Sequence, residues 1–305
     1  MPWLEVSVRC RAAQQPAAEA ALEDLGALSV TLLDAQADTP DEHAVLEPGV
    51  GETPLWDTLV VQGLFPAGAD RRGLLLALDE WLPDLHADAV SFREVADQDW
   101  ERVWLDQYQP MRFGRRLWIY PWTIEPPADD GAVVVRLDPG LAFGTGTHPT
   151  TALCLEWLDG LPLAGRTVLD FGCGSGVLAI AALKLGASHA VGIDNDPQAL
   201  QATADNAERN GVAAALSLAT PEQAPPQPCA VVVANILANA LDALAPRIAA
   251  LTAPGGVLAL SGILAGQEGA LLARYAEWFD ALEVTRREDW IRIDGVRRGD
   301  RSTEP

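Results

Sequence analysis

TVLDFGCGSGVLA, residues 167–179, is the stretch of sequence that decides the fold of this chain. It begins as an apolar strand, continues into a turn with glycine at three alternate positions (Gly172, Gly174 and Gly176), and then runs directly into a helical pattern. Glycine suits such a turn because it lets a ligand approach the backbone and tolerates positive φ angles. The start of the helix then offers free N–H groups to an anionic group. The stretch therefore predicts a βα unit whose turn binds a ligand.

The same alternation of strands and helices extends through the second half of the chain. Strands are predicted at 167–171, 190–194, 215–219, 230–234 and 256–261, helices at 151–158, 177–185, 197–210, 239–251 and 267–279, and a closing antiparallel pair at 282–286 and 290–294. Alternating βα units require a parallel sheet with helices on both faces. We therefore predict an α/β domain over residues 123–300, in which the closing pair departs from a plain dinucleotide-binding fold.

The first 95 residues have a different order of elements. Strands are predicted at 3–10, 29–34, 58–65 and 89–95, and helices at 16–25 and 71–82. The order β-α-β-β-α-β is that of a small ferredoxin-like α+β domain. Nothing in residues 1–95 indicates catalysis, so we expect this domain to recognise or position a partner. A purely structural role is the alternative.

Aromatic residues and arginines crowd into the segment between the two domains, among them Trp100, Trp104, Tyr108, Phe113, Trp118 and Trp122. Such interleaving occurs in platforms that bind nucleic acid. The spacing of Trp100 and Trp104, however, suits one face of a short helix. We favour an aromatic-rich linker over residues 96–122 that packs against both domains, because the rest of the chain is acidic.

Charge narrows the choice of partners. The 305 residues include 21 Lys and Arg against 43 Asp and Glu, which gives a formal net charge of −22. A surface this acidic repels phosphate backbones, so we expect no direct nucleic-acid binding. It would attract a basic protein or peptide, although acidity that only maintains solubility is an equal alternative.

Metal sites and membrane segments are not expected. The four cysteines and four histidines are too scattered to form a zinc site. The N-terminus lacks the apolar core of a signal peptide, and the longest nearly apolar stretch, 251–266, is interrupted by Pro254 and two glycines. We therefore expect a cytoplasmic protein without a membrane-spanning helix; we also expect a monomer.

Two carboxylates indicate which ligand the glycine turn binds. Asp194 ends the strand that follows, about twenty residues beyond the turn, where a carboxylate can accept hydrogen bonds from ribose hydroxyls. Nicotinamide enzymes favour the spacing GxGxxG, whereas this turn is GxGxG preceded by Asp170. A carboxylate beside the turn suits an ammonium group better than a pyrophosphate. We therefore favour S-adenosylmethionine and a methyltransferase; an oxidoreductase and a non-catalytic S-adenosylmethionine sensor are the alternatives.

Two further segments contribute candidate site residues. The Gly- and Thr-rich stretch 138–151 is typical of a loop that encloses a ligand; it contains Phe143 and ends at Thr151, where a helix begins. His148 in this loop is either a general base or a residue that caps or packs the loop. A predicted buried strand ends at Asn235, whose amide oxygen can accept a hydrogen bond from a target amine. The alternative is that Asn235 only caps the following turn.

Five runs of the sequence resemble the ribosomal protein L11 methyltransferase family, PrmA: LDPGLAFGTGTHPTT, DFGCGSGVLAIAALKLGA, DNAERNGV, VVANILA and SGILA. The resemblance extends over the whole chain, including the segment Met111–Trp118. It implies a ferredoxin-like substrate-recognition domain, a linker, and a Rossmann-like seven-stranded class I methyltransferase domain. It implies methylation of lysine side-chain and N-terminal amino groups of ribosomal protein L11, with another protein or a small-molecule amine as the alternative substrate.

The resemblance also implies which residues bind the cofactor. The family's binding positions correspond to Thr151, Gly172, Asp194 and Asn235, and the patterns described above add Asp170, Gly174 and Phe143. Asn235 is also expected to position the target amine. Asn195, directly after Asp194, departs from the apolar residue that is commoner at that position, but the carboxylate is retained.

Overall fold

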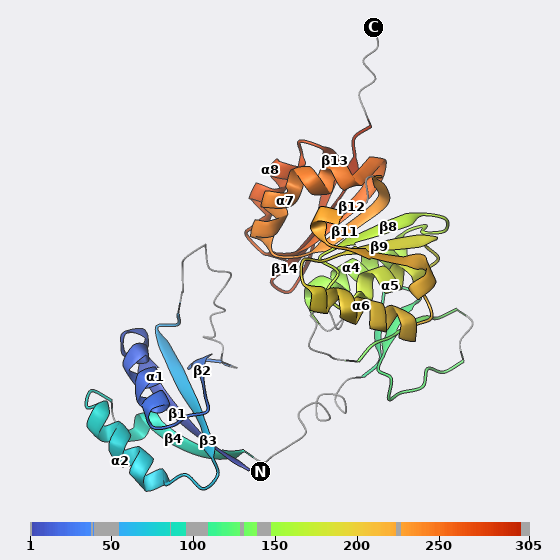
Figure 1. The fold of residues 1–305 in the computed structure, drawn as a ribbon. Coiled ribbons are helices and arrows are strands. Elements are labelled where there is room, and N and C mark those ends of the chain that lie inside the picture. Colours follow the sequence, from blue (N-terminus) through green and yellow to red (C-terminus); the bar gives the residue numbers. More distant parts are fainter. Residues whose placement is uncertain are drawn as a thin grey trace. The chain divides into compact units, whose positions relative to one another are not determined.

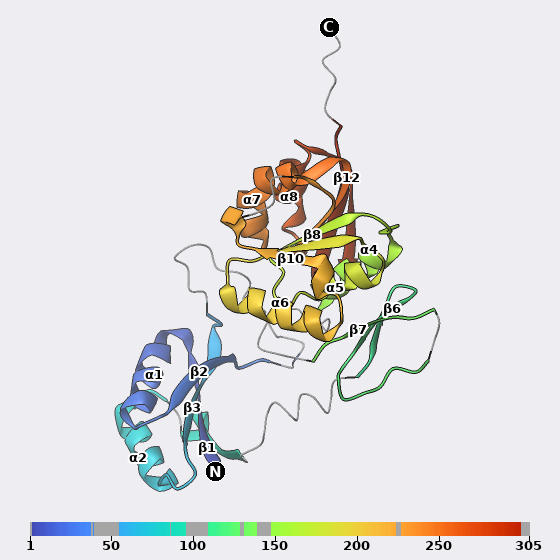
Figure 2. The same ribbon diagram turned by 45° about the vertical axis from the view of Figure 1, so that its right-hand side comes forward.

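A computed structural model of the chain describes residues 2–37, 39, 55–85, 87–95, 109–128, 131–138, 148–223 and 227–299. It divides into two compact units, Met1–Trp100 and Glu101–Pro305, each drawn in Figures 1 and 2. Each unit has its own hydrophobic core and is described by itself.

The first unit is a four-stranded antiparallel sheet with the strand order β2-β3-β1-β4. Its elements are β1 (Trp3–Arg11), α1 (Gln15–Asp24), β2 (Ser29–Asp34), β3 (Thr58–Pro66), α2 (Arg71–Trp81) and β4 (Val90–Val95). Both helices cover the same face of the sheet (Figure 1). Alternate residues of β1, such as Val6 and Val8, point to that face and are fully buried beside Leu22 and Leu78 of the helices.

The second unit contains a seven-stranded sheet with the order β10-β9-β8-β11-β12-β14-β13. Its elements are α4 (Pro149–Gly160), β8 (Thr167–Phe171), α5 (Val177–Lys184), β9 (His189–Ile193), α6 (Pro197–Arg209), β10 (Leu216–Ala219), β11 (Cys229–Asn235), α7 (Ala238–Leu251), β12 (Thr252–Leu264), α8 (Glu268–Tyr275), β13 (Phe279–Arg287) and β14 (Trp290–Arg297). Strands β8 to β12 pair in parallel, and β14 pairs antiparallel with both β12 and β13. The predicted α/β fold class and its antiparallel closing pair are confirmed.

Helices cover both faces of this sheet (Figure 2). Successive residues of a strand point to opposite faces, and β8 follows this rule: Val168 packs in the core beneath α4 and α5, whereas Leu169 packs in the core beneath α7 and α8. Because both residues are fully buried, β8 buries apolar side chains on both of its faces, as is typical of a central parallel strand. None of the helices in the described residues is long and apolar enough to span a membrane.

The segment expected to be a linker differs from the prediction in its second half. Residues from 111 onward form a separate three-stranded sheet of β5 (Met111–Phe113), β6 (Leu117–Tyr120) and β7 (Val133–Arg136). Leu117 and Ile119 are fully buried in the same core as α4 and α5. This part of the segment therefore belongs to the second unit. The helix expected around Trp100 and Trp104 lies outside the described residues.

Candidate functional site

A cavity of about 410 Å³ opens at the carboxyl ends of the central parallel strands. This is the edge where ligands bind in open α/β sheets. The cavity is lined by His148, Thr150, Thr151, Gly172, Cys173, Gly174, Val177, Leu178, Asp194, Asn195, Asn235, Ile236, Leu237, Gly262 and Trp290. Of the predicted site residues, Thr151, Gly172, Gly174, Asp194 and Asn235 therefore meet in one cavity. Phe143 lies outside the described residues.

The glycine turn between β8 and α5 has the conformation that its sequence predicts. Gly172, Gly174 and Gly176 have φ angles of 77°, 53° and 79°, a region that side-chain-bearing residues rarely adopt. A Cβ atom on Gly172 would also lie 2.2 Å from a methyl carbon of Ile236. Glycine is thus required here both for the backbone angle and for the close approach of the β11 end.

Asp194 joins the next strand to this turn. Its Oδ2 accepts a hydrogen bond of 2.9 Å from the backbone N–H of Gly174, and its Oδ1 accepts one of 3.0 Å from the N–H of Asp196. The carboxylate is half-buried and lines the cavity. Each carboxylate oxygen can accept more than one hydrogen bond, so Asp194 retains acceptor capacity towards a ligand.

The expectation for Asp170 needs correction. Asp170 is fully buried and is not among the residues that line the cavity. Its Oδ2 accepts a 3.1 Å hydrogen bond from the N–H of Ala179, within α5. Burial raises the pKa of Asp170 to about 8, and the nearby charge of Asp194 adds to the increase. Asp170 therefore supports the turn from behind as a mainly neutral group, and it does not present a carboxylate to an ammonium group in the cavity.

Asn235 ends β11 with its amide directed at α4. Its Nδ2 donates a hydrogen bond of 3.2 Å to Oγ1 of Thr151. Its Oδ1 is buried and has no hydrogen-bond partner among the described residues. The following helix begins at Ala238 and has no side-chain cap, so Asn235 does not cap it. A buried acceptor without a partner is costly unless a ligand satisfies it.

His148 caps the N-terminus of α4. Its Nδ1 accepts from the N–H of Thr150 at 3.4 Å and lies 2.7 Å from Oγ1 of the same residue. The imidazole also meets the Trp290 ring edge-on, with ring centroids 4.6 Å apart. Burial lowers the pKa of His148, and the charge of Glu288 opposes this decrease. These contacts favour the capping interpretation of His148 over the general base.

Several residues of the cavity wall were not predicted as site residues, and four of them come from the ends of β11, β12 and β14. Ile236 and Leu237 follow Asn235, Gly262 lies in β12, and Trp290 begins β14. Gly262 has a φ of +85°, and a Cβ there would lie 2.3 Å from the carbonyl oxygen of Ile236. Trp290 reaches the cavity only because β14 inserts antiparallel beside β12. No local pattern encodes that placement.

Other chemistry is not evident in the parts of the chain that the structure describes. Within these residues, no three His, Cys, Asp or Glu side chains group to hold a metal ion. The four cysteines are free and buried. The cavity at the glycine turn is therefore the candidate site.

Comparison with known proteins identifies the family. A sequence model of the family described as "Ribosomal protein L11 methyltransferase (PrmA)" matches residues 2–298. A protein of that name from Stenotrophomonas maltophilia (strain K279a) is 64% identical over 306 residues, covering 98% of this chain and 100% of the relative. One from Xanthomonas axonopodis pv. citri (strain 306) is 60% identical with the same coverage.

A solved structure agrees with this result. The crystal structure described as ribosomal protein L11 methylase from Lactobacillus delbrueckii subsp. bulgaricus is 33% identical, has a TM-score of 0.58, and covers 63% of this chain and 100% of that chain. The second unit thus has the Rossmann-like class I methyltransferase fold. The chain belongs to the ribosomal protein L11 methyltransferase (PrmA) family, whose methyl donor is S-adenosylmethionine.

Proposed function

We propose that this chain transfers methyl groups from S-adenosylmethionine to lysine side-chain and N-terminal amino groups of ribosomal protein L11. The observation that carries the proposal is the buried Oδ1 of Asn235, an acceptor without a partner among the described residues, in a cavity that also holds the glycine turn. The names of the relatives favour L11 over another protein or a small amine as the substrate.

The residues of the cavity fit the cofactor. Asp194 has acceptor capacity for ribose hydroxyls, and Gly172 and Gly174 leave the backbone accessible. Thr151 at the start of α4 offers a hydroxyl beside Asn235. We assign cofactor binding to these five residues. Asp170 keeps only a supporting role, because it lies behind the turn.

Asn235 also positions the target amine in this proposal. When bound, S-adenosylmethionine supplies a methyl group activated by the sulfonium charge, so the S–C bond breaks as the N–C bond forms. Asn235 Oδ1 accepts a hydrogen bond from the neutral amine and thereby directs the lone pair of the amine nitrogen towards the methyl carbon. Alignment of this kind is worth up to about 7–11 kcal/mol in favourable cases.

The amine must lose its proton before it reacts. For a free lysine with a pKa of about 10.4, deprotonation at pH 7 costs roughly 4–5 kcal/mol. Ile236, Leu237 and Trp290 give the cavity apolar walls beside Asn235, and an apolar environment disfavours the ammonium form. The proton passes to water as the target lysine side chain enters the cavity, without a dedicated base.

The first unit recognises the substrate in this proposal. It has a separate core, and the described residues that line the cavity all belong to the second unit. The net charge of −22 suits a basic ribosomal protein and opposes a nucleic-acid partner. We propose that the chain acts as a monomer in the cytoplasm.

A radiochemical assay tests the proposal. Purified chain is incubated with S-adenosylmethionine that carries a tritiated methyl group and with purified ribosomal protein L11. Label on L11, located by mass spectrometry on amino groups, is the expected result. Binding of the cofactor without label transfer would indicate a sensor, and a nicotinamide fluorescence change on titration would indicate an oxidoreductase. Either outcome refutes the proposal.

A further inference from the structure

Helix α6 holds the glycine turn through two side chains. The hydroxyl of Thr203 donates a 2.9 Å hydrogen bond to the carbonyl oxygen of Gly174. One turn further along the helix, Nδ2 of Asn206 donates a 2.9 Å bond to the carbonyl oxygen of Ser175. The two consecutive carbonyls of the turn are therefore both fixed by the same helix.

Gly174 is held on its other side as well. Its N–H donates to Oδ2 of Asp194, while its carbonyl accepts from Thr203. Thr203 is fully buried, and its hydroxyl is closer to Gly174 than to Cys173 Sγ, which lies at 3.5 Å. A change at Thr203 therefore reaches the Asp194 carboxylate through one glycine residue that has no side chain to restrain its φ and ψ angles.

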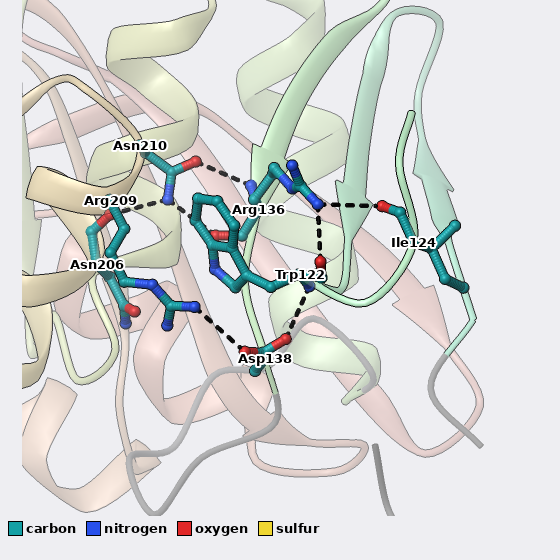
Figure 3. A network of polar contacts seen from close by, with 7 residues as sticks. All are labelled: Trp122, Ile124, Arg136, Asp138, Asn206, Arg209 and Asn210. Atoms are coloured by element: carbon teal, nitrogen blue, oxygen red, sulfur yellow. Dashed lines mark hydrogen bonds and ion pairs between the residues drawn. The ribbon is translucent and has the colours of Figure 1, made fainter. Parts of the chain in front are cut away.

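The far end of α6 is fixed to β7, as Figure 3 shows. Asn210 pairs with both backbone groups of Arg136: its Oδ1 accepts from the N–H at 2.8 Å, and its Nδ2 donates to the carbonyl at 2.8 Å. The guanidinium of Arg209 stacks on the Trp122 ring at 4.4 Å and pairs with Asp138 at 3.4 Å. Because this end is anchored, Thr203 and Asn206 have a fixed base from which to hold the turn.

We infer that Thr203 and Asn206 are positioning residues for cofactor binding. They orient the backbone of the glycine turn, and Thr203 acts through Gly174 on the carboxylate of Asp194. The inference rests on the proposed use of this cavity for S-adenosylmethionine. Neither side chain lines the cavity, so their effect on the cofactor is indirect.

The decisive variant is Thr203→Val, which keeps the shape of the side chain and removes the hydroxyl. Thr203→Ser restores the hydroxyl and should restore binding. Thr252→Val is the matched control, because the Thr252 hydroxyl is also buried and donates a 2.9 Å bond to the carbonyl of Ile248, outside the cavity. Asn206→Ala is a milder second variant, since alanine maintains the helix while the bond to Ser175 is lost.

Calorimetric titration with S-adenosylhomocysteine, the demethylated product, measures the dissociation constant, and a thermal melt of each variant measures stability. Loss of the hydrogen bond from Thr203 to Gly174 should raise the dissociation constant for S-adenosylhomocysteine roughly three- to tenfold in Thr203→Val. We expect a smaller increase of this dissociation constant for Asn206→Ala. In both variants, kcat measured at saturating cofactor should change far less than the dissociation constant. Thr203→Ser should bind like the unaltered chain, and Thr252→Val should lower the melting temperature without changing binding.

Equal binding by Thr203→Val and Thr252→Val would overturn the inference, as would failure of Thr203→Ser to restore affinity. If Thr203→Val does not fold, unchanged binding by Asn206→Ala overturns it instead. If the unaltered chain shows no heat of binding with S-adenosylhomocysteine, the proposed function itself fails, which is a different result.

Discussion

Substituting Asp170 by asparagine should make the stability of the second unit less dependent on pH. The folded-state pKa of Asp170 is about 8, against 3.8 for the unperturbed group. Between these values the unfolded chain binds fewer protons than the folded chain, so the free energy of unfolding decreases as pH rises. The contribution of Asp170 is fully present below pH 3.8 and is lost as pH rises through about 8.

The size of the effect follows from the same two pKa values. Between pH 5 and pH 8 the linkage relation gives a loss of about 4 kcal/mol, which is a large part of the stability of an ordinary domain. The asparagine side chain of the Asp170→Asn variant cannot ionise, and its amide oxygen can accept the bond from Ala179 as the carboxyl does. The NH2 group of this asparagine takes the place of the hydroxyl of protonated Asp170, near the buried Oδ1 that has no partner among the described residues. The variant therefore resembles the neutral form of Asp170 at every pH.

Urea unfolding at pH 5, 6, 7 and 8 measures this difference. We expect the free energy of unfolding of Asp170→Asn, relative to the unaltered chain, to increase steadily across the series. Asp280→Asn serves as a control, because it makes the same change of carboxylate to amide at a side chain that is 66% exposed and pairs with Arg298 at the surface. A difference between Asp170→Asn and the unaltered chain that stays constant from pH 5 to pH 8 would refute the reasoning.

Three further predictions concern activity, association and stability. Asn235→Ala should lower kcat more than it lowers affinity for S-adenosylhomocysteine, because Asn235 Oδ1 is assigned to the amine; steady-state kinetics with L11 check this, and an unchanged kcat removes Asn235 from the mechanism. Raising the ionic strength should weaken the complex with L11, and titration calorimetry that finds no such weakening excludes electrostatic attraction. Asp159→Asn should lower the free energy of unfolding by about 1.5–3 kcal/mol, because it removes the charge of a buried carboxylate whose Oδ2 accepts from the N–H groups of Arg115 and Arg116 and whose Oδ1 pairs with the Arg116 guanidinium at 3.4 Å; urea unfolding measures the loss, and no loss would contradict these contacts.

The βα units were predictable because their sequence patterns are local. The strand Thr167–Phe171 was predicted at the bounds that the structure gives, and α6 differs by one residue at its end. Apolar runs, a proline in the first helical turn and a glycine after the last one each report on only a few neighbouring residues.

The sheet β5-β6-β7 was not predicted, because its signal is not local. In β6 the buried Leu117 and Ile119 alternate with the large aromatics Trp118 and Tyr120, so the polar positions that mark a half-buried strand are absent. The partner β7 lies beyond a stretch without strands among its described residues. Only pairing in three dimensions identifies this segment as part of the second unit.

The candidate site was predictable only in part, at the residues that follow the parallel strands. Residues at strand ends, such as Asp194 and Asn235, come together because parallel strands share one edge. Asp170 was wrongly predicted to face the ligand. Successive residues at the end of a strand point to opposite faces of the sheet, and the sequence does not show which face α5 covers. Trp290 was missed because it enters from an antiparallel strand.

The amide of Asn210 has a consequence for solubility. Strand β7 is the outer member of its sheet, and outer strands expose unpaired backbone groups that can recruit a strand from another molecule. At Arg136 both of those groups are already occupied by one asparagine side chain from the end of α6. Neither backbone group of Arg136 is therefore available to pair with a strand from another molecule, which is how a side chain can protect an outer strand against edge-to-edge association.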